Sequence, residues 1–127
     1  MTFLPSDDHE YLKRAAIEYE EFDAGGVRGV IFRKFALPVG KYNANEADIL
    51  TVLRDGYPDV GPDMFYANPR LNFVGGGSPG ATTVDETFNG RLWQRWSRHD
   101  TTNGWRSGID GIQTQVERIR EALRVAA

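Results

Sequence analysis

Residues 107–125 read SGIDGIQTQVERIREALRV, and this stretch decides the fold class. Its apolar residues recur at intervals of three and four, which is the spacing of one buried helix face. They are Ile109, Ile112, Val116, Ile119 and Leu123. Ser107 and Asp110 resemble a capping box, so the sequence predicts a C-terminal helix that opens near Ser107. The other face is polar, as expected for a helix lying on a sheet.

Three segments upstream of this helix have the composition of β-strands. Residues 27–37 (VRGVIFRKFAL) are rich in the β-branched and aromatic side chains that suit a half-buried sheet. Residues 48–53 and 64–67 follow as two shorter strands, each separated from the strand before it by a turn that contains glycine and proline. We therefore predict an antiparallel β-meander.

The N-terminal segment has the features of a helix start. Ser6 can act as a cap, and acidic residues follow it at the positive end of the helix dipole. We predict a helix over residues 7–21, broken by glycines at 25 and 26. Its expected buried positions are Leu12, Ala15, Ala16, Tyr19 and Phe22. Residues 68–91, which include three consecutive glycines, are expected to form a long functional loop, and the whole to be one α+β domain over residues 1–127.

The composition excludes several classes of chemistry. The chain has 127 residues, a net charge of −3, two histidines and no cysteine. Thiol nucleophiles, disulfide frameworks and cysteine-ligated metal sites are thereby ruled out. The acidic balance disfavours a main role in coating nucleic acid or anionic membrane. No cofactor or metal is expected, and the absence of a signal-peptide pattern predicts a cytoplasmic protein.

A serine and a histidine stand two positions apart near the end of the sequence NGRLWQRWSRH. On an extended segment, Ser97 and His99 would point to the same side, so the imidazole could take the hydroxyl proton. Two tryptophans and three arginines surround this pair. A loop serine beside a structurally bonded histidine explains the same letters, so the motif alone leaves both interpretations open.

Three segments in order resemble the ubiquitin-conjugating enzyme (UBC, or E2) superfamily, and more closely a prokaryotic E2-like branch. They are YPDVGPDMF at 57–65, WQRWSRH at 93–99 and GWRSGIDGI at 104–112. The resemblance covers residues 7–125 and implies a UBC-like fold: an N-terminal helix, an antiparallel meander, a long active-site loop and a C-terminal helix. Relatives of that branch accompany a ubiquitin-like protein, an activating-enzyme homologue and a peptidase.

This chain departs from that superfamily at the catalytic position. The superfamily uses a cysteine eight to ten residues before the tryptophan at 105, and Ser97 stands in that window. The resemblance therefore implies a carrier of a ubiquitin-like protein through an oxyester on Ser97, with His99 as base and Asn72 steadying an oxyanion. Other hydroxyl candidates are Ser78, Thr82 and Thr83. The activating enzyme is expected on the N-terminal helix, at Glu10, Lys13, Arg14 and Glu18.

Two other functions remain open at this point. The first is a non-catalytic UBC variant that binds a ubiquitin-like protein or its activating enzyme. The second is an RNA-binding module built on Arg91, Arg95, Arg98 and the tryptophans, which the acidic net charge disfavours.

Overall fold

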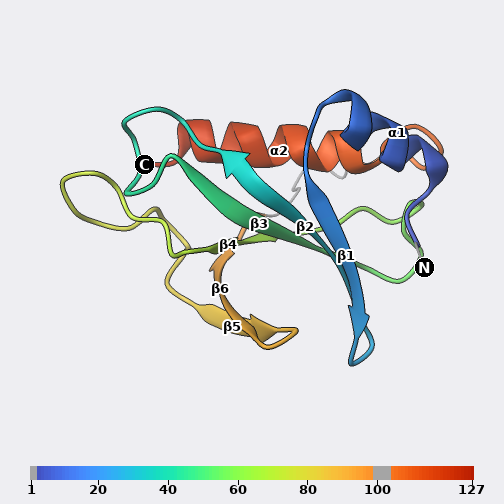
Figure 1. Cartoon of the computed structure of the whole chain (residues 1–127), viewed down its shortest axis with the longest axis horizontal. Coiled ribbons are helices and arrows are strands. Elements are labelled where there is room, and N and C mark those ends of the chain that lie inside the picture. Colours follow the sequence, from blue (N-terminus) through green and yellow to red (C-terminus); the bar gives the residue numbers. More distant parts are fainter. Residues whose placement is uncertain (1–2, 99–103) are drawn as a thin grey trace.

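A computed structural model describes residues 3–98 and 104–127. The helices are α1 (Ser6–Arg14) and α2 (Ile112–Val125), and the strands are β1 (Tyr19–Ala24), β2 (Val27–Ala36), β3 (Glu46–Leu53), β4 (Phe65–Asn68), β5 (Asp85–Phe88) and β6 (Arg91–Trp96). The strands form one antiparallel sheet in the order β1-β2-β3-β4-β6-β5. Helix α2 runs across one face of this sheet, and α1 packs near its N-terminal end (Figure 1). The predicted α+β class is confirmed, and the three predicted strands are present as β2, β3 and β4.

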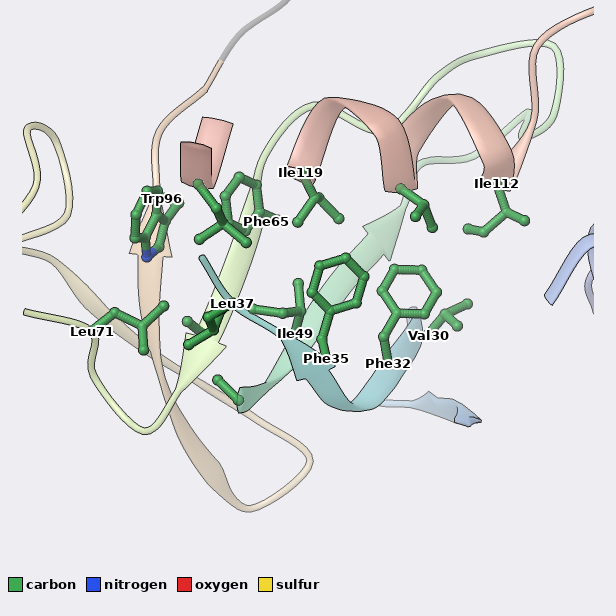
Figure 2. Close-up of a cluster of buried hydrophobic side chains, with 14 of the residues drawn as sticks. Val30, Phe32, Phe35, Leu37, Ile49, Phe65, Leu71, Trp96, Ile112 and Ile119 are labelled. Atoms are coloured by element: carbon green, nitrogen blue, oxygen red, sulfur yellow. The ribbon is translucent and has the colours of Figure 1, made fainter. Parts of the chain in front are cut away.

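Helix α2 supplies the centre of the core. Its predicted apolar face is confirmed at four positions, Ile112, Val116, Ile119 and Leu123, none of which is more than 1% exposed. They pack on aliphatic and aromatic side chains of the sheet (Figure 2). Ile109, in contrast, is 69% exposed, so its place in the buried face was predicted wrongly. The Asp110 carboxylate accepts the Arg106 N–H at 2.7 Å and closes a turn there, so the helix begins later.

Helix α1 is shorter than predicted. It ends at Arg14, and Ala16 takes a φ of +55°, a left-handed conformation that stops a helix. Tyr19 to Ala24 instead pair with β2 as the strand β1. Of the five positions expected to be buried on one helix face, Leu12 is fully buried, whereas Ala15 and Ala16 are exposed. Ser6 is the first helical residue and makes no capping bond, so that prediction is also wrong.

Two glycine turns explain the strands that the prediction missed. Gly25 and Gly26 both have positive φ and join β1 to β2, and Asn89 and Gly90 do the same between β5 and β6. Positive φ at both central residues is the geometry of a tight hairpin turn. The segment 68–91, predicted as one loop, therefore contains β5 at its end.

The sheet buries side chains on both faces. A bulge in β2 between Phe32 and Phe35 leaves both rings in the core beneath α2. On the opposite face Ile31, Leu50, Tyr66 and Trp93 form a second buried cluster, with Phe22, Val52 and Phe88 around it. The central strands β2 and β3 therefore bury consecutive residues, 29–32 and 49–51, rather than only alternate ones.

Asp8 joins the two helices. Its carboxylate is buried, with the residue 5% exposed, and accepts the Tyr57 hydroxyl at 2.5 Å and the Ile112 N–H at 3.0 Å. The residue before α2 is Gly111, which has no side chain to cap the helix. An acidic residue from α1 therefore caps α2 and also satisfies the positive end of its dipole.

Candidate functional site

Ser97 directly follows β6 and is half-buried. Its backbone N–H donates to the Ala81 carbonyl at 3.1 Å, so the glycine-rich segment lies beside it. Its hydroxyl donates to the Met64 sulfur at 3.6 Å. A thioether is a weak acceptor and cannot take up the proton at neutral pH. This contact alone does not activate Ser97 as a nucleophile.

Arg98 is the cation nearest to Ser97 in sequence. One of its Nη atoms donates to the Gly80 carbonyl at 3.0 Å and to the Ser97 carbonyl at 3.1 Å, while the guanidinium lies 4.9 Å from the Trp96 ring centroid. Partial burial lowers the pKa of Arg98, and the nearby Tyr42 opposes that shift. The guanidinium is thus held over the strand end by carbonyls and a ring.

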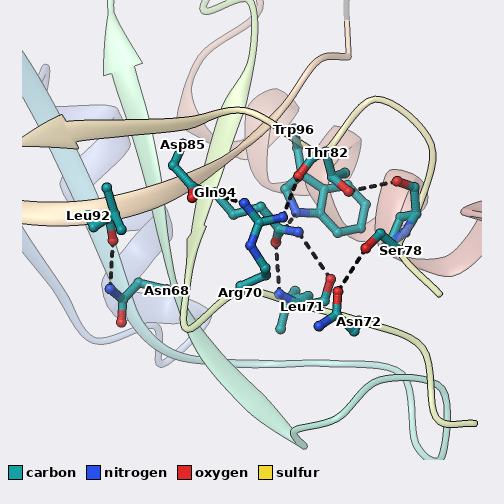
Figure 3. Close-up of polar contacts among 11 residues, drawn as sticks. Asn68, Arg70, Leu71, Asn72, Ser78, Thr82, Asp85, Leu92, Gln94 and Trp96 are labelled. Carbon is teal, nitrogen blue, oxygen red and sulfur yellow. Dashed lines mark hydrogen bonds and ion pairs between the residues drawn. The ribbon is translucent and has the colours of Figure 1, made fainter. Parts of the chain in front are cut away.

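Asn72 lies next to Ser78 (Figure 3). The Ser78 hydroxyl donates to the Asn72 side-chain oxygen at 3.0 Å. The Asn43 N–H donates to the Asn72 carbonyl at 2.9 Å, and the Asn72 N–H donates to the Asn43 side-chain oxygen at 3.1 Å. These contacts join Asn72 to Ser78 and Asn43, and its role beside Ser97 stays a prediction. The glycine turn at 75–77 returns the chain toward Asn72, which brings the serine at 78 to it.

Gln94 is a positioning residue that sequence reasoning missed. Its side chain is buried, with the residue 2% exposed, and it accepts from Leu71 N–H at 2.8 Å and from the Trp96 indole N–H at 3.0 Å, while donating to the Leu71 carbonyl at 3.1 Å. It therefore clamps the segment before Asn72 onto β6 (Figure 3). The sequence did contain a signal for this role: a polar glutamine lies between two tryptophans on the strand, two positions before Trp96 and so on the same face of the sheet.

Of the two remaining hydroxyl candidates, Thr83 is exposed and Thr82 is sealed from solvent. Thr82 is fully buried and donates to the Pro79 carbonyl at 2.6 Å. Arg70 holds the same segment through the Thr82 carbonyl and the Asp85 carboxylate. His99, the predicted base, lies outside the described residues.

Trp105 packs on the two-proline loop at 57–62. Its indole N–H donates to the Pro58 carbonyl at 2.9 Å, and its ring centroid lies 6.2 Å from that of Tyr57. Gly61 lies so close beneath the indole that an added Cβ would come within 2.4 Å of it. The Ser107 hydroxyl donates to Asp59. The loop and the segment before α2 are thereby joined into one rigid surface.

The family comparison bears on this arrangement. The sequence profile described as prokaryotic E2 family E matches residues 4–126, almost the whole chain. The chain belongs to prokaryotic E2 family E. No curated protein and no solved structure matches it. Membership establishes an E2-like role in a ubiquitin-like pathway at the level of the family, and the helix–sheet–helix arrangement is the UBC-like fold.

In this family E chain, α1 presents most of its charged side chains to solvent, Asp8 excepted. Glu10, Lys13 and Arg14 are exposed on the helix, and Glu18 is exposed just before β1 rather than on the helix as predicted. Between α1 and the 107–110 turn lies an open hollow of 400 Å³, with acidic side chains from both sides. Ile109 stands exposed at its rim.

The arginines and tryptophans do not form a stacking platform. Trp93 and Trp96 are 1% and 0% exposed. Arg91 pairs with Asp48 at 3.0 Å, and Arg95 pairs with Glu86 at 3.2 Å. Because the rings are buried and these two arginines face carboxylates, the contacts disfavour the RNA-binding interpretation.

Residues 3–98 and 104–127 contain neither a grouping of metal-binding side chains nor a membrane-spanning helix. Within them, no three or more acidic or histidine side chains are grouped so as to hold a metal ion. No helix among them has the length and apolar character needed to cross a bilayer.

Proposed function

We propose that this family E protein is a non-catalytic E2-like subunit, which binds a ubiquitin-like protein or its activating-enzyme homologue without carrying a covalent adduct. The observation behind this proposal is the set of groups that accept the candidate hydroxyl protons. Ser97 donates to a thioether, Ser78 to an amide oxygen and Thr82 to a backbone carbonyl. A serine nucleophile needs a base, and none of these three acceptors is one at neutral pH.

The surface around Trp105 supports a binding role. Val60, in the two-proline loop, is 39% exposed, and Ile109, in the turn before α2, is 69% exposed. Trp105 and Asp110 fix these two segments in place. Rigid apolar groups beside charged ones are typical of protein-binding surfaces. The exposed charges of α1 border the same hollow, so an activating enzyme docked on α1 would also reach Ile109.

A second candidate function is the oxyester carrier, and the position of Ser97 favours it. The hydroxyl is half-buried at a strand end, beside a guanidinium that can offset negative charge on a tetrahedral intermediate. In that mechanism Ser97 Oγ attacks the thioester carbonyl of the activated ubiquitin-like protein, His99 takes the proton, and the activating enzyme's thiolate leaves. A substrate nucleophile then attacks the ester carbonyl and loses its own proton to solvent, while Ser97 Oγ leaves and regains the proton that His99 took.

One experiment separates these functions. The chain, its activating-enzyme homologue, the ubiquitin-like protein and ATP are incubated together, and intact masses are recorded alongside binding isotherms for each partner. We expect binding with no added mass. A thiol-resistant, base-labile adduct that disappears in Ser97→Ala but persists in Ser78→Ala would establish the carrier instead.

The binding face is tested in the same isotherms. Reversing Lys13 and Arg14 to glutamate should weaken binding of the activating enzyme at least tenfold, while the matched reversal of Arg28, on the β1–β2 hairpin, should leave it unchanged. If the wild-type protein shows no binding of either partner and forms no adduct, both functions are refuted.

A further inference from the structure

A groove beside the C-terminal half of α2 combines an apolar floor with cationic walls. One part is a hollow of 320 Å³ lined by Ala36, Leu37, Pro38, Arg120, Leu123 and Arg124. A second hollow of 300 Å³ shares Ala36 and Arg120 with it and extends toward the end of α1. We call the two together the α2 groove.

The cations of the α2 groove differ in their availability. Arg124 is paired with Glu121, and Arg33 is paired with Glu20. Arg120 and Lys34 are exposed, and within the part of the chain that the structure describes neither forms an ion pair. The Arg120 guanidinium lies 5.5 Å from the centroid of the Phe35 ring. Because Phe35 lines the groove, this contact places the guanidinium over the groove floor. Two exposed cations of the groove are therefore available to pair with carboxylates of a partner. Among the lining residues only Glu18 carries a carboxylate.

Exposed apolar side chains flank the same groove. Val39 follows the lining residue Pro38 and is 97% exposed, and Val125 follows Arg124 and is 55% exposed. The loop after β2 and the end of α2 lie side by side (Figure 1), tied by the Lys41 ammonium, which donates to the Arg124 carbonyl at 2.7 Å. The apolar floor thus continues onto an exposed apolar rim, which is a feature of binding surfaces rather than of solvated ones.

We propose that the α2 groove binds a segment of a partner protein in which one apolar side chain is flanked by carboxylates. The apolar side chain would lie on Leu37 and Leu123, and the carboxylates would pair with Arg120 and Lys34. Charge complementarity of this kind steers encounter and fixes register. A nucleic acid supplies the negative charge but no aliphatic group for the floor. The proposal does not depend on the role of Ser97, which lies elsewhere.

The test is an NMR titration of the isotopically labelled protein with a synthetic acetylated peptide, Glu-Glu-Asp-Leu-Glu-Glu. The matched control peptide carries serine in place of leucine. We expect amide shift changes to gather in residues 33–39 and 117–126 and to be much smaller with the serine peptide. Arg120→Glu should raise the Kd about tenfold, Arg120→Gln less, and the matched Arg28→Glu less than twofold. Thermal melting of each variant checks that it is folded.

Three outcomes would overturn the proposal. The first is that the shift changes lie outside the groove. The second is that the two peptides bind equally, and the third is that Arg120→Glu leaves the Kd unchanged. Sedimentation velocity tests whether a second copy of this chain fills the groove instead. Concentration-dependent self-association that Arg120→Glu abolishes would show that it does, and would overturn the proposal.

Discussion

Replacing Asp8 by alanine should destabilise the protein far more than its place in a short terminal helix suggests. The change removes the acceptor for both the Tyr57 hydroxyl and the Ile112 N–H. Hydrogen bonds to a charged group are worth about 1.5–3 kcal/mol each. Tyr57 is half-buried and can partly regain water, whereas Ile112 is fully buried. We therefore expect a loss of about 3 kcal/mol in the free energy of unfolding.

Urea unfolding followed by far-UV circular dichroism measures this loss. For a chain of this size each kcal/mol corresponds to a Tm shift of about 3–5 °C, so melting should fall by about 10 °C. Asp8→Asn keeps one acceptor oxygen, so its Tm should lie between those of the wild type and Asp8→Ala. The matched control is Asp7→Ala, because Asp7 is exposed on the same helix. A loss below about 1 kcal/mol for Asp8→Ala would refute the idea that α1 caps α2.

Three further predictions concern the core and the loops. Gln94→Leu leaves two buried N–H donors without their acceptor and should lower the free energy of unfolding by about 3 kcal/mol, measured by urea unfolding. Gly61→Ala places a methyl group against the Trp105 indole and should change the near-UV circular dichroism and lower Tm. Burial, and then a hydrogen bond to Glu86, raises the pKa of Tyr66 above its ordinary value. The unfolded state therefore ionises first, and stability should fall as pH rises above about 10.

Each of these has its own control. Gln113→Leu changes an exposed position of α2 and should leave unfolding within about 0.5 kcal/mol of wild type. Gly80→Ala meets only a backbone oxygen at 4.0 Å, so it should be tolerated. Tyr66→Phe should flatten the alkaline loss of stability, and a loss as steep as in the wild type would mean that Tyr66 does not cause it.

Local patterns predicted the parts of the fold that are governed by one-sided burial. The spacing of apolar residues from Ile112 to Leu123 identified α2, because the helix is buried on one face only and its other face is polar. The boundaries of α1 were not predictable from helix propensity, since the pairing of Tyr19 with Phe32 across the sheet overrides it. The glycine pair at 25–26 and the Asn89-Gly90 turn were available hairpin signals.

The candidate site was less accessible to sequence reasoning than the fold. Ser97 directly follows β6, and its hydroxyl donates to Met64, 33 positions earlier, a partner that no local pattern predicts. The contact of Asn72 with Ser78 was not predicted, because a turn of three glycines, not a spacing rule, brings the two residues together. The clamp formed by Gln94 links segments 23 residues apart, and no local pattern reports such a bond.

The two outermost strands of the sheet have a consequence for how this molecule tolerates crowding. Strand β1 carries Glu20, Glu21 and Asp23, and β5 carries Asp85 and Glu86. Arginines pair with four of these carboxylates, those of Glu20, Asp23, Asp85 and Glu86, so each margin carries hydrated ion pairs beside its open backbone. A second sheet that docked strand to strand on such a margin would have to displace the water around these charges, which favours dispersed molecules over stacked ones.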